Sequence, residues 1–272
     1  MTRRLDRRRL GLAPGLTLGV TSLWFSVLVL IPLVAVLVSA ASGGWSGFWS
    51  VLTNHETASA IELTVVSSVV ITLLNVVIGT MTAWVLVRDR FWGRGVVDLV
   101  IDVPFALPTI VAGLVLLALY GADSPLGVNI ANTRTAVLFA LAFVTLPFVV
   151  RTVQPVLETM DRDVEEAAAS LGAGRLTTFR RVILPSLIPA IAAGAALSFA
   201  RAISEYGSLV LLSGNLPNRT EVASVRVLTY VETGDQSSAA AVAAVLLVVA
   251  LVVIFGLDLL QRRLVRLEVA DA

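Results

Sequence analysis

The sequence has no cysteine and no lysine, and it contains a single histidine, His55. Without cysteine the chain cannot form disulfides, iron–sulfur clusters or a thiol nucleophile. One histidine cannot build a multi-histidine metal site. Without lysine the chain can form neither a Schiff base nor the phosphate-binding loop of a Walker A ATPase. We therefore expect no cofactor and no bound metal.

Charge is also scarce. Only 14% of the 272 residues are charged, whereas 57% are hydrophobic and the mean hydropathy is +0.90. No soluble domain of this size needs so much apolar surface, so the lipid bilayer is the expected solvent. The net charge of +1 says little about partners, and we expect no nucleic acid among them.

Six apolar runs are each long enough to cross about 30 Å of hydrocarbon as a helix, which takes about 20 residues. Continuous runs favour helices, because a membrane-spanning barrel would show alternating segments of about ten residues. We expect an all-α integral membrane protein in which residues 1–272 form a single transmembrane domain. The six helices are predicted near residues 16–41, 60–87, 96–120, 135–153, 186–212 and 238–260.

The arginines indicate the orientation of these helices. Sixteen of them lie in the N-terminal tail, the second and fourth connections and the C-terminal tail, whereas the alternate connections hold only Arg134, Arg219 and Arg226. Positive residues collect on the cytoplasmic side, so both termini are predicted to be cytoplasmic. The first apolar run exceeds the usual 7–15 residues of a signal peptide, so we expect an uncleaved first helix. Residues 42–59 are expected to form an outer loop carrying an interfacial aromatic belt.

The cytoplasmic connection at residues 158–185 is the longest polar interruption. Acidic residues at its start suit a helix N-terminus, three alanines follow, and Gly172 stands where a C-cap glycine with positive φ is expected. Thr177 or Thr178 is predicted to cap a second helix. The segment should form two short helices joined by a sharp turn, which could receive another protein. An amphipathic loop lying on the membrane is the alternative.

The spacing in this connection resembles a known motif. Glu166-Ala167-Ala168, three residues, Gly172, nine residues, Val182, one residue and Leu184-Pro185 resembles the EAA loop of ATP-binding-cassette importer permeases, in which isoleucine is usual at the position of Val182. The resemblance implies the type I importer permease fold, with this loop as a coupling helix that docks on a separate ATPase. It assigns that role to Glu166, Ala167, Ala168, Gly172, Leu184 and Pro185, and it agrees with the missing lysine.

The resemblance covers about residues 24–262. Residues 102–114, DVPFALPTIVAGL, and 199–208, FARAISEYGS, are similar to the third- and fifth-helix signatures of sulfate/thiosulfate permeases, and residues 213–217 fit the T-type subunit. The family commonly has glycine at the position of Ser204. This similarity implies an inner-membrane subunit that works with a second permease, ATPase subunits and an extracytoplasmic sulfate-binding protein.

Two features mark a candidate pathway. Arg201 and Glu205 are one helical turn apart in an apolar run, where a charge costs on the order of 3 kcal/mol and needs a partner or water. They form either a structural salt bridge or a paired, gating cation beside an anion path. Pro104 and Pro108 should kink or unwind the third helix, either lining a cavity or simply bending it.

Two further sets of residues are expected to serve packing. The stripe Ala192, Ala196, Ala200 and Ser204 suits close helix packing, with this chain or with the second permease. Asp98 and Asp102 are expected near the cytoplasmic end of the third helix, where they could mark the interface.

The expected function is the permease subunit of a sulfate/thiosulfate importer. A molybdate or tungstate permease is the nearest alternative, because those oxyanions have similar charge and shape. A membrane-embedded enzyme would need a cluster of ionisable residues at one depth, and apart from Arg201 and Glu205 none is seen. A non-transporting membrane scaffold is the remaining alternative.

Overall fold

The computed structural model describes residues 12–271, with side chains from Leu16 to Arg263 apart from Arg162 and Arg175. The basic N-terminal tail that indicated orientation lies outside the described residues. Every element from Leu12 to Asp271 is helical, which confirms the all-α prediction. The elements are α1 (Leu12–Phe25), α2 (Ile31–Ser42), α3 (Gly44–Thr53), α4 (His55–Arg88), α5 (Arg94–Ala106), α6 (Thr109–Tyr120), α7 (Arg134–Thr159), α8 (Arg162–Ser170), α9 (Arg175–Thr178), α10 (Leu184–Ile203), α11 (Gly207–Leu212), α12 (Ala223–Glu232) and α13 (Gln236–Asp271).

Five continuous helical spans are long and apolar enough to cross a membrane. They correspond to five of the six predicted segments, usually with longer ends. Short π-helical segments, Ser26–Leu30 and Phe179–Ile183, join α1 to α2 and α9 to α10 without ending those spans. The spans are Leu16–Ser42, His55–Arg88, Arg134–Thr159, Leu176–Ile203 and Gln236–Arg263.

The third predicted segment, residues 96–120, is not one helix. It consists of α5 and α6, which are bent by 118° across Leu107 and Pro108. Leu107 is extended, with ψ of 134°, because a residue that precedes proline is disfavoured in the α region. Pro104 lies inside the last turn of α5 and does not end it. The predicted disruption is therefore located at Pro108, and it is a break in the span.

Other boundaries also differ from the sequence predictions. The fifth predicted segment, residues 186–212, leaves the helix at Ser204 and resumes as α11. The outer loop predicted at residues 42–59 is wrong, because α3 fills most of it and α4 begins at His55. Arg151, counted among the sixteen arginines of the tails and connections although it falls inside the predicted segment 135–153, lies within α7.

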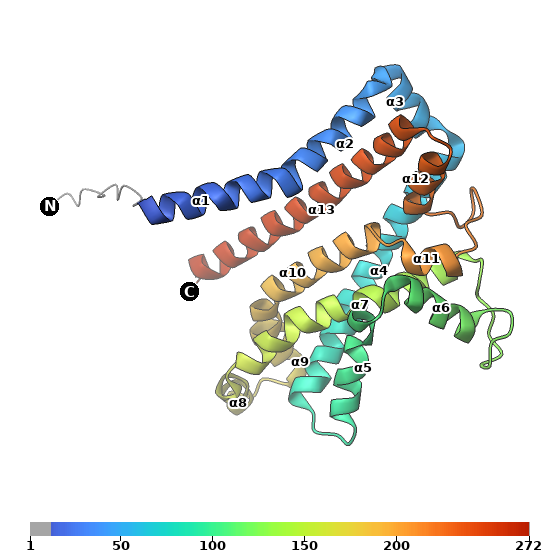
Figure 1. Ribbon diagram of the computed structural model, residues 1–272. Coiled ribbons are helices and arrows are strands. Elements are labelled where there is room, and N and C mark those ends of the chain that lie inside the picture. Colours follow the sequence, from blue (N-terminus) through green and yellow to red (C-terminus); the bar gives the residue numbers. More distant parts are fainter. Residues whose placement is uncertain (1–11, 272) are drawn as a thin grey trace.

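The first span is almost separate from the rest of the chain. Figure 1 shows α2 running beside α13, and α1 extending away from the main bundle. Ala40 is the only residue of α2 that is buried. The start of α1, the end of α13 and α8 lie toward one end of the molecule, and α3 and α12 lie toward the other (Figure 1).

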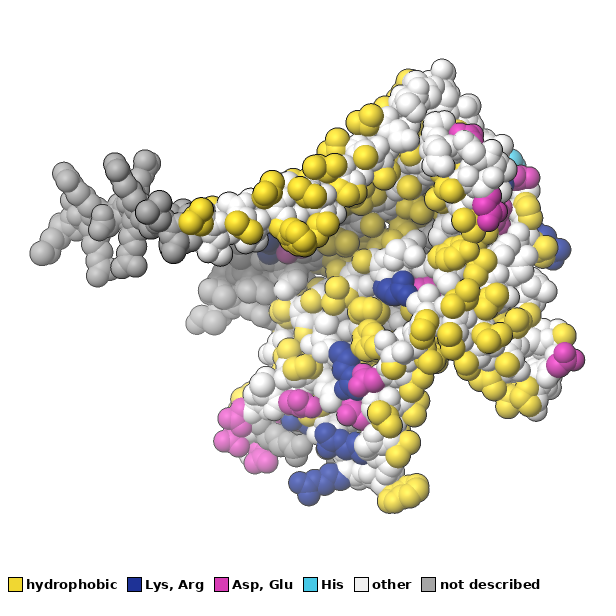
Figure 2. Space-filling view, viewed as in Figure 1, with side chains coloured by type: hydrophobic (Ala, Val, Ile, Leu, Met, Phe, Trp, Pro, Cys, Tyr) yellow, Lys and Arg dark blue, Asp and Glu magenta, His cyan; other side chains and the backbone are white. Residues whose placement is uncertain are grey.

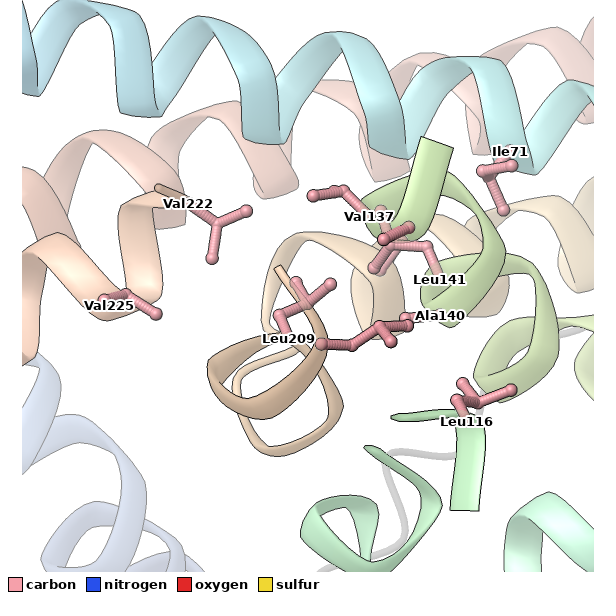
Figure 3. Close-up of a cluster of buried hydrophobic side chains, with 11 residues drawn as sticks. Ile71, Leu116, Val137, Ala140, Leu141, Leu209, Val222 and Val225 are labelled. Carbon is pink, nitrogen blue, oxygen red and sulfur yellow. The ribbon is translucent and has the colours of Figure 1, made fainter. Parts of the chain in front are cut away.

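Two apolar clusters hold the main bundle together. In one, side chains from α4, α6, α7, α11 and α12 converge, among them Ile71, Leu116, Leu141 and Leu209 (Figure 3). The other joins α4, α7 and α10, with Leu86, Val153 and Leu187 buried within it. Burying such side chains stabilises a fold through close van der Waals packing, which in lipid takes over from the hydrophobic effect.

Helices α4, α7 and α10 approach very closely around Val149 of α7. A Cβ on Gly79 of α4 would lie 2.8 Å from the Val149 Cβ, and a Cβ on Gly194 of α10 would lie 3.0 Å from its Cα and overlap Thr152 Oγ1. Glycine lets helix backbones meet in this way. The three helices consequently form one tightly packed unit.

Candidate functional site

The segment between α7 and α10 contains a short helix, α8, that ends in a sharp turn, as predicted, but the predicted second short helix is not separate, because α9 continues through Phe179–Ile183 into α10. Asp161 caps α8, and its carboxylate accepts a hydrogen bond from the Asp163 backbone N–H at 3.0 Å. At the other end Gly172 has φ of +83°. The Gly172 N–H donates to the Ala169 carbonyl at 2.9 Å, and the Ala173 N–H donates to the Ala168 carbonyl at 3.0 Å. This pair of bonds is the Schellman arrangement, which stops a helix sharply.

The predicted threonine cap of the second short helix is wrong. Helix α9 begins at Arg175, before either threonine, and Thr178 lies at its end. The Thr178 backbone N–H donates to the Gly174 carbonyl at 3.0 Å, so it is part of the helix and not of its cap.

The residues assigned to coupling divide into two places. Glu166 and Ala167 are exposed on α8, Ala168 is half-buried there, and Gly172 is exposed in the turn. Leu184 and Pro185 are half-buried at the start of α10, where the chain rejoins the bundle. The first group therefore lies on α8 and its turn, mostly exposed, whereas the second group lies at the start of a membrane-spanning helix.

The chain also contains an ion pair that was not predicted from sequence. Arg88 Nη2, at the end of α4, lies 2.7 Å from Glu165 Oε1 on α8. These residues are 77 positions apart, so neither helical periodicity nor a local motif could join them. The available signal was a basic residue at the end of one predicted helix and an acidic residue in a later polar connection.

Arg201 and Glu205 form the predicted ion pair, with 2.7 Å between Arg201 Nη2 and Glu205 Oε2. Glu205 was expected inside a helix, but it lies just after the end of α10. Its carboxylate is fully buried, and its Oε1 accepts hydrogen bonds from the Ser208 backbone N–H at 2.9 Å and from the Ser208 hydroxyl at 2.8 Å. The Arg201 side chain remains 30% exposed. The buried carboxylate therefore orients a guanidinium that is partly exposed on the surface of this chain.

The break between α5 and α6 lies close to the break between α10 and α11 beside this pair. A Cβ on Gly207, at the start of α11, would overlap Thr109 Oγ1 and lie 2.7 Å from the Ile110 nitrogen of α6. A Cβ on Gly113 would lie 2.8 Å from the Ser208 Cα. Backbone contact of this kind puts the break at Pro108 next to the break that contains Glu205. Pro104 is on the far side of the bend, on α5, and is not part of this contact.

A second charged cluster joins α5 to α7. The Arg151 side chain donates to Asp102 Oδ1 and Asp98 Oδ1, both at 2.7 Å, and to the Asp98 carbonyl at 2.9 Å. Asp98 and Asp102 therefore connect α5 to α7 within this chain. Their side chains are also 43% and 48% exposed. Figure 2 shows that charged side chains form small islands among apolar ones on the face in view.

The small-residue stripe is not the tightest packing face of α10. Ala192, Ala196 and Ala200 are half-buried and Ser204 is exposed, whereas Gly194 and Ser198 are buried against the bundle. A small residue does permit close helix approach on α10, but it is Gly194, which packs against α7, and not a member of the predicted stripe.

A third cluster lies at the end of the molecule opposite α8. The Arg226 side chain of α12 is 11% exposed, and it lies 2.7 Å from Glu56 and 3.9 Å from Glu221. It also lies over the Tyr230 ring, 4.9 Å from the centroid. Burial raises the pKa of the Glu221 carboxyl, and the Arg226 charge opposes that rise only in part. His55, beside Glu56, pairs through Nδ1 with Asn218 Oδ1 at 2.6 Å.

No group of three or more histidine, cysteine, aspartate or glutamate side chains that could hold a metal is found among the residues described. Three arginines, Arg88, Arg151 and Arg226, form ion pairs with carboxylates of other helices, and such pairs help to fix helix positions.

Comparison with known proteins identifies relatives along most of the chain. Residues 75–266 match the family described as "Binding-protein-dependent transport system inner membrane component". The sulfate transport system permease protein CysT of Salmonella typhimurium is 40% identical over 259 residues, covering 92% of this chain and 94% of that protein. The CysT protein of Synechocystis is 44% identical over 250 residues, covering 89% and 87%.

Solved structures share the fold. A chain of a bacterial alginate ABC transporter, in complex with a periplasmic protein that holds an alginate pentasaccharide, superposes with a TM-score of 0.74 at 20% identity and covers 91% of this chain and 93% of its own. A chain of the MetNI methionine ABC transporter in an inward-facing conformation gives a TM-score of 0.59 at 18% identity, covering 75% and 94%. At these identities the similarity concerns the fold alone.

Proposed function

This chain belongs to the family of binding-protein-dependent transport system inner membrane components, and from that premise we propose that it is a permease subunit of an ATP-driven sulfate/thiosulfate importer. It is a multi-pass membrane transport component and not an enzyme. The substrate assignment rests on the 40–44% identity, over most of the chain, to proteins named as sulfate transport permeases. Those names do not favour the molybdate or tungstate alternative.

In this proposal the work is divided among several chains. ATPase subunits bind the α8 surface formed by Glu166, Ala167, Ala168 and Gly172, and Leu184 and Pro185 carry the resulting movement into α10. A second permease completes the pathway, and an extracytoplasmic sulfate-binding protein delivers the anion. Both termini and α8 face the cytoplasm, an orientation supported by the positive-inside distribution of arginine and by the position of α8 and the described ends on one side (Figure 1).

The proposed pathway passes the contact between the α5–α6 break and the α10–α11 break. Arg201 supplies a cation that is partly exposed, and Glu205 holds it in place from a buried position. A buried, paired carboxylate repels a passing dianion less than a free one would, because its charge is compensated by the guanidinium. Pro108 breaks the third span at this level and Pro104 shapes the helix that leads to it. Irregular backbone at membrane depth is tolerated where it lines a cavity or is covered by protein.

The substrate is tested by radiolabelled uptake in a strain that lacks this gene. We expect sulfate uptake and growth on sulfate as sole sulfur source to be lost and then restored by the plasmid-borne gene. Thiosulfate uptake is measured alongside. Unchanged growth on sulfate together with lost molybdate uptake would contradict the proposed substrate.

The docking surface is tested by co-purification with the ATPase. Gly172→Val should abolish it, because a β-branched residue is strained at positive φ and would disturb the turn after α8. Gly172→Asn is the matched control, since asparagine tolerates this conformation. Glu166→Arg should also abolish co-purification by reversing a charge on the exposed surface. Normal co-purification of both Gly172→Val and Glu166→Arg would count against docking here and favour the scaffold alternative.

A further inference from the structure

Helix α8 rests only lightly on the membrane-spanning helices. On α8, Val164 is 50% exposed, and Leu171 just after it is 89% exposed. Among the ion pairs between described side chains, the one that joins α8 to a membrane-spanning helix is Arg88 with Glu165, at 2.7 Å. Apolar packing therefore offers little to carry a displacement of α8 into the bundle.

A groove lies between α4, which carries Arg88, and α8, which carries Glu165. It has a volume of about 750 Å³, and Trp84, Arg88, Glu165, Ala169 and Phe179 are among the residues that line it. Because van der Waals contact is lost across an open space, α8 and α4 are not pressed together here. The ion pair lies at this groove and joins α8 to α4.

Arg88 is held rigidly enough to act as such a connection. Its side chain is only 9% exposed, and its guanidinium lies over the Trp84 ring, 5.9 Å from the centroid. The Trp84 ring meets Phe179 edge to face, with 5.5 Å between centroids. Arg88 Nη2 also donates to the Met160 carbonyl, at the junction of α7 and α8, at 3.4 Å. A guanidinium fixed on several sides cannot follow α8 without moving α4 as well.

We propose that Arg88 is a positioning residue that transmits movement of α8 into α4 through its ion pair with Glu165. This inference rests on the proposed function, since it assumes that an ATPase moves α8. Two adjacent carboxylates then have different tasks. Glu166 is exposed and belongs to the docking surface, whereas Glu165 is 24% exposed and faces inward to Arg88.

The experiment uses the whole transporter, purified and reconstituted in liposomes with its loaded binding protein. Three quantities are measured for each variant: the amount of ATPase that co-purifies, the rate of ATP hydrolysis, and the sulfate transported per ATP hydrolysed. The variants are Arg88→Gln, Glu165→Gln, the double variant and Arg88→Lys. Arg262→Gln is the matched control, because Arg262 forms an exposed ion pair with Asp258 on α13.

We expect Arg88→Gln and Glu165→Gln to assemble with the ATPase and still hydrolyse ATP, while sulfate transported per ATP falls about tenfold, which corresponds to ~1.4 kcal/mol of lost coupling. The double variant should lose no more than either single variant, because both remove the same interaction. Arg88→Lys, which keeps the charge, should retain most of the coupling, and Arg262→Gln should be unaffected.

Normal transport per ATP in both single variants, or losses that add in the double variant, would overturn the inference. If Arg88→Gln fails to assemble, Glu165→Gln decides, because it removes only the charge and keeps the shape. Failure of the proposed function would look different: the unaltered protein itself would neither co-purify with an ATPase nor transport sulfate.

Discussion

The Arg201–Glu205 pair allows a prediction whose size follows from burial. Glu205→Gln keeps the shape of the side chain and an oxygen that can accept from Ser208, but it removes the charge that faces Arg201. Breaking a fully buried ion pair costs about 3–5 kcal/mol, because the remaining charge is left uncompensated. Arg201 is 30% exposed and regains some hydration, so we expect a smaller loss in unfolding free energy, about 2 kcal/mol.

The chain offers a control pair with the same spacing. Asp258 and Arg262 are also four residues apart and 2.8 Å from each other, but their side chains are 42% and 69% exposed. Exposed pairs of this kind contribute about 0.3–0.5 kcal/mol. Asp258→Asn should therefore change stability by much less than Glu205→Gln.

Thermal melting of the purified protein in detergent measures both variants. A chain of this size changes its midpoint by about 2–4 °C for each kcal/mol, so Glu205→Gln should lower the midpoint by about 4–8 °C and Asp258→Asn by at most about 2 °C. Equal shifts in the two variants would refute the reasoning, because they would show that burial of Glu205 has no energetic weight. A normal midpoint for Glu205→Gln would refute it as well.

Two more predictions use melting midpoints. Gly194→Ala should destabilise the chain by about 1–3 kcal/mol by overpacking α10 on α7, whereas Gly256→Ala, with no neighbour within 4 Å of the added Cβ, should be neutral or stabilising by up to about 1 kcal/mol; equal effects would argue against the close contact. Burial raises the pKa of Glu221, so the folded state holds that proton more tightly than the unfolded state and stability falls as pH rises above about 4.3. Glu221→Gln should therefore raise the midpoint at pH 8 more than at pH 4, and a midpoint gain that does not depend on pH would contradict it.

Local patterns in the sequence predicted local structure well. Apolar length located the spans, and the acidic start, alanine run and Gly172 predicted α8 and its turn, because capping and helix propensity depend on neighbouring residues. The i, i+4 spacing of Arg201 and Glu205 predicted their ion pair even though the helix ends between them. Pro108 predicted a disruption, but a proline cannot say whether a helix bends slightly or by 118°.

Contacts between distant segments could not be predicted in the same way. Arg88 with Glu165, and Arg151 with Asp98 and Asp102, join residues from different helices, and their pairing depends on how those helices pack. The segment carrying Trp45 and Phe48 was predicted as a loop between the first two apolar runs, yet it is α3. Its Trp45 ring stacks on Phe48 at 5.9 Å, an interaction that single-residue propensity does not contain.

The close contact of α4, α7 and α10 around Val149 has a mechanical consequence. Packed interiors resist compression and shear, so these helices have no free path along which one could slide past another. The segment that includes α8 is attached to the end of α7 and the beginning of α10, and Arg88 ties it to α4. If an ATPase moves α8 as proposed, we expect α4, α7 and α10 to turn together as one body, because all three are connected to α8 and packed closely on one another.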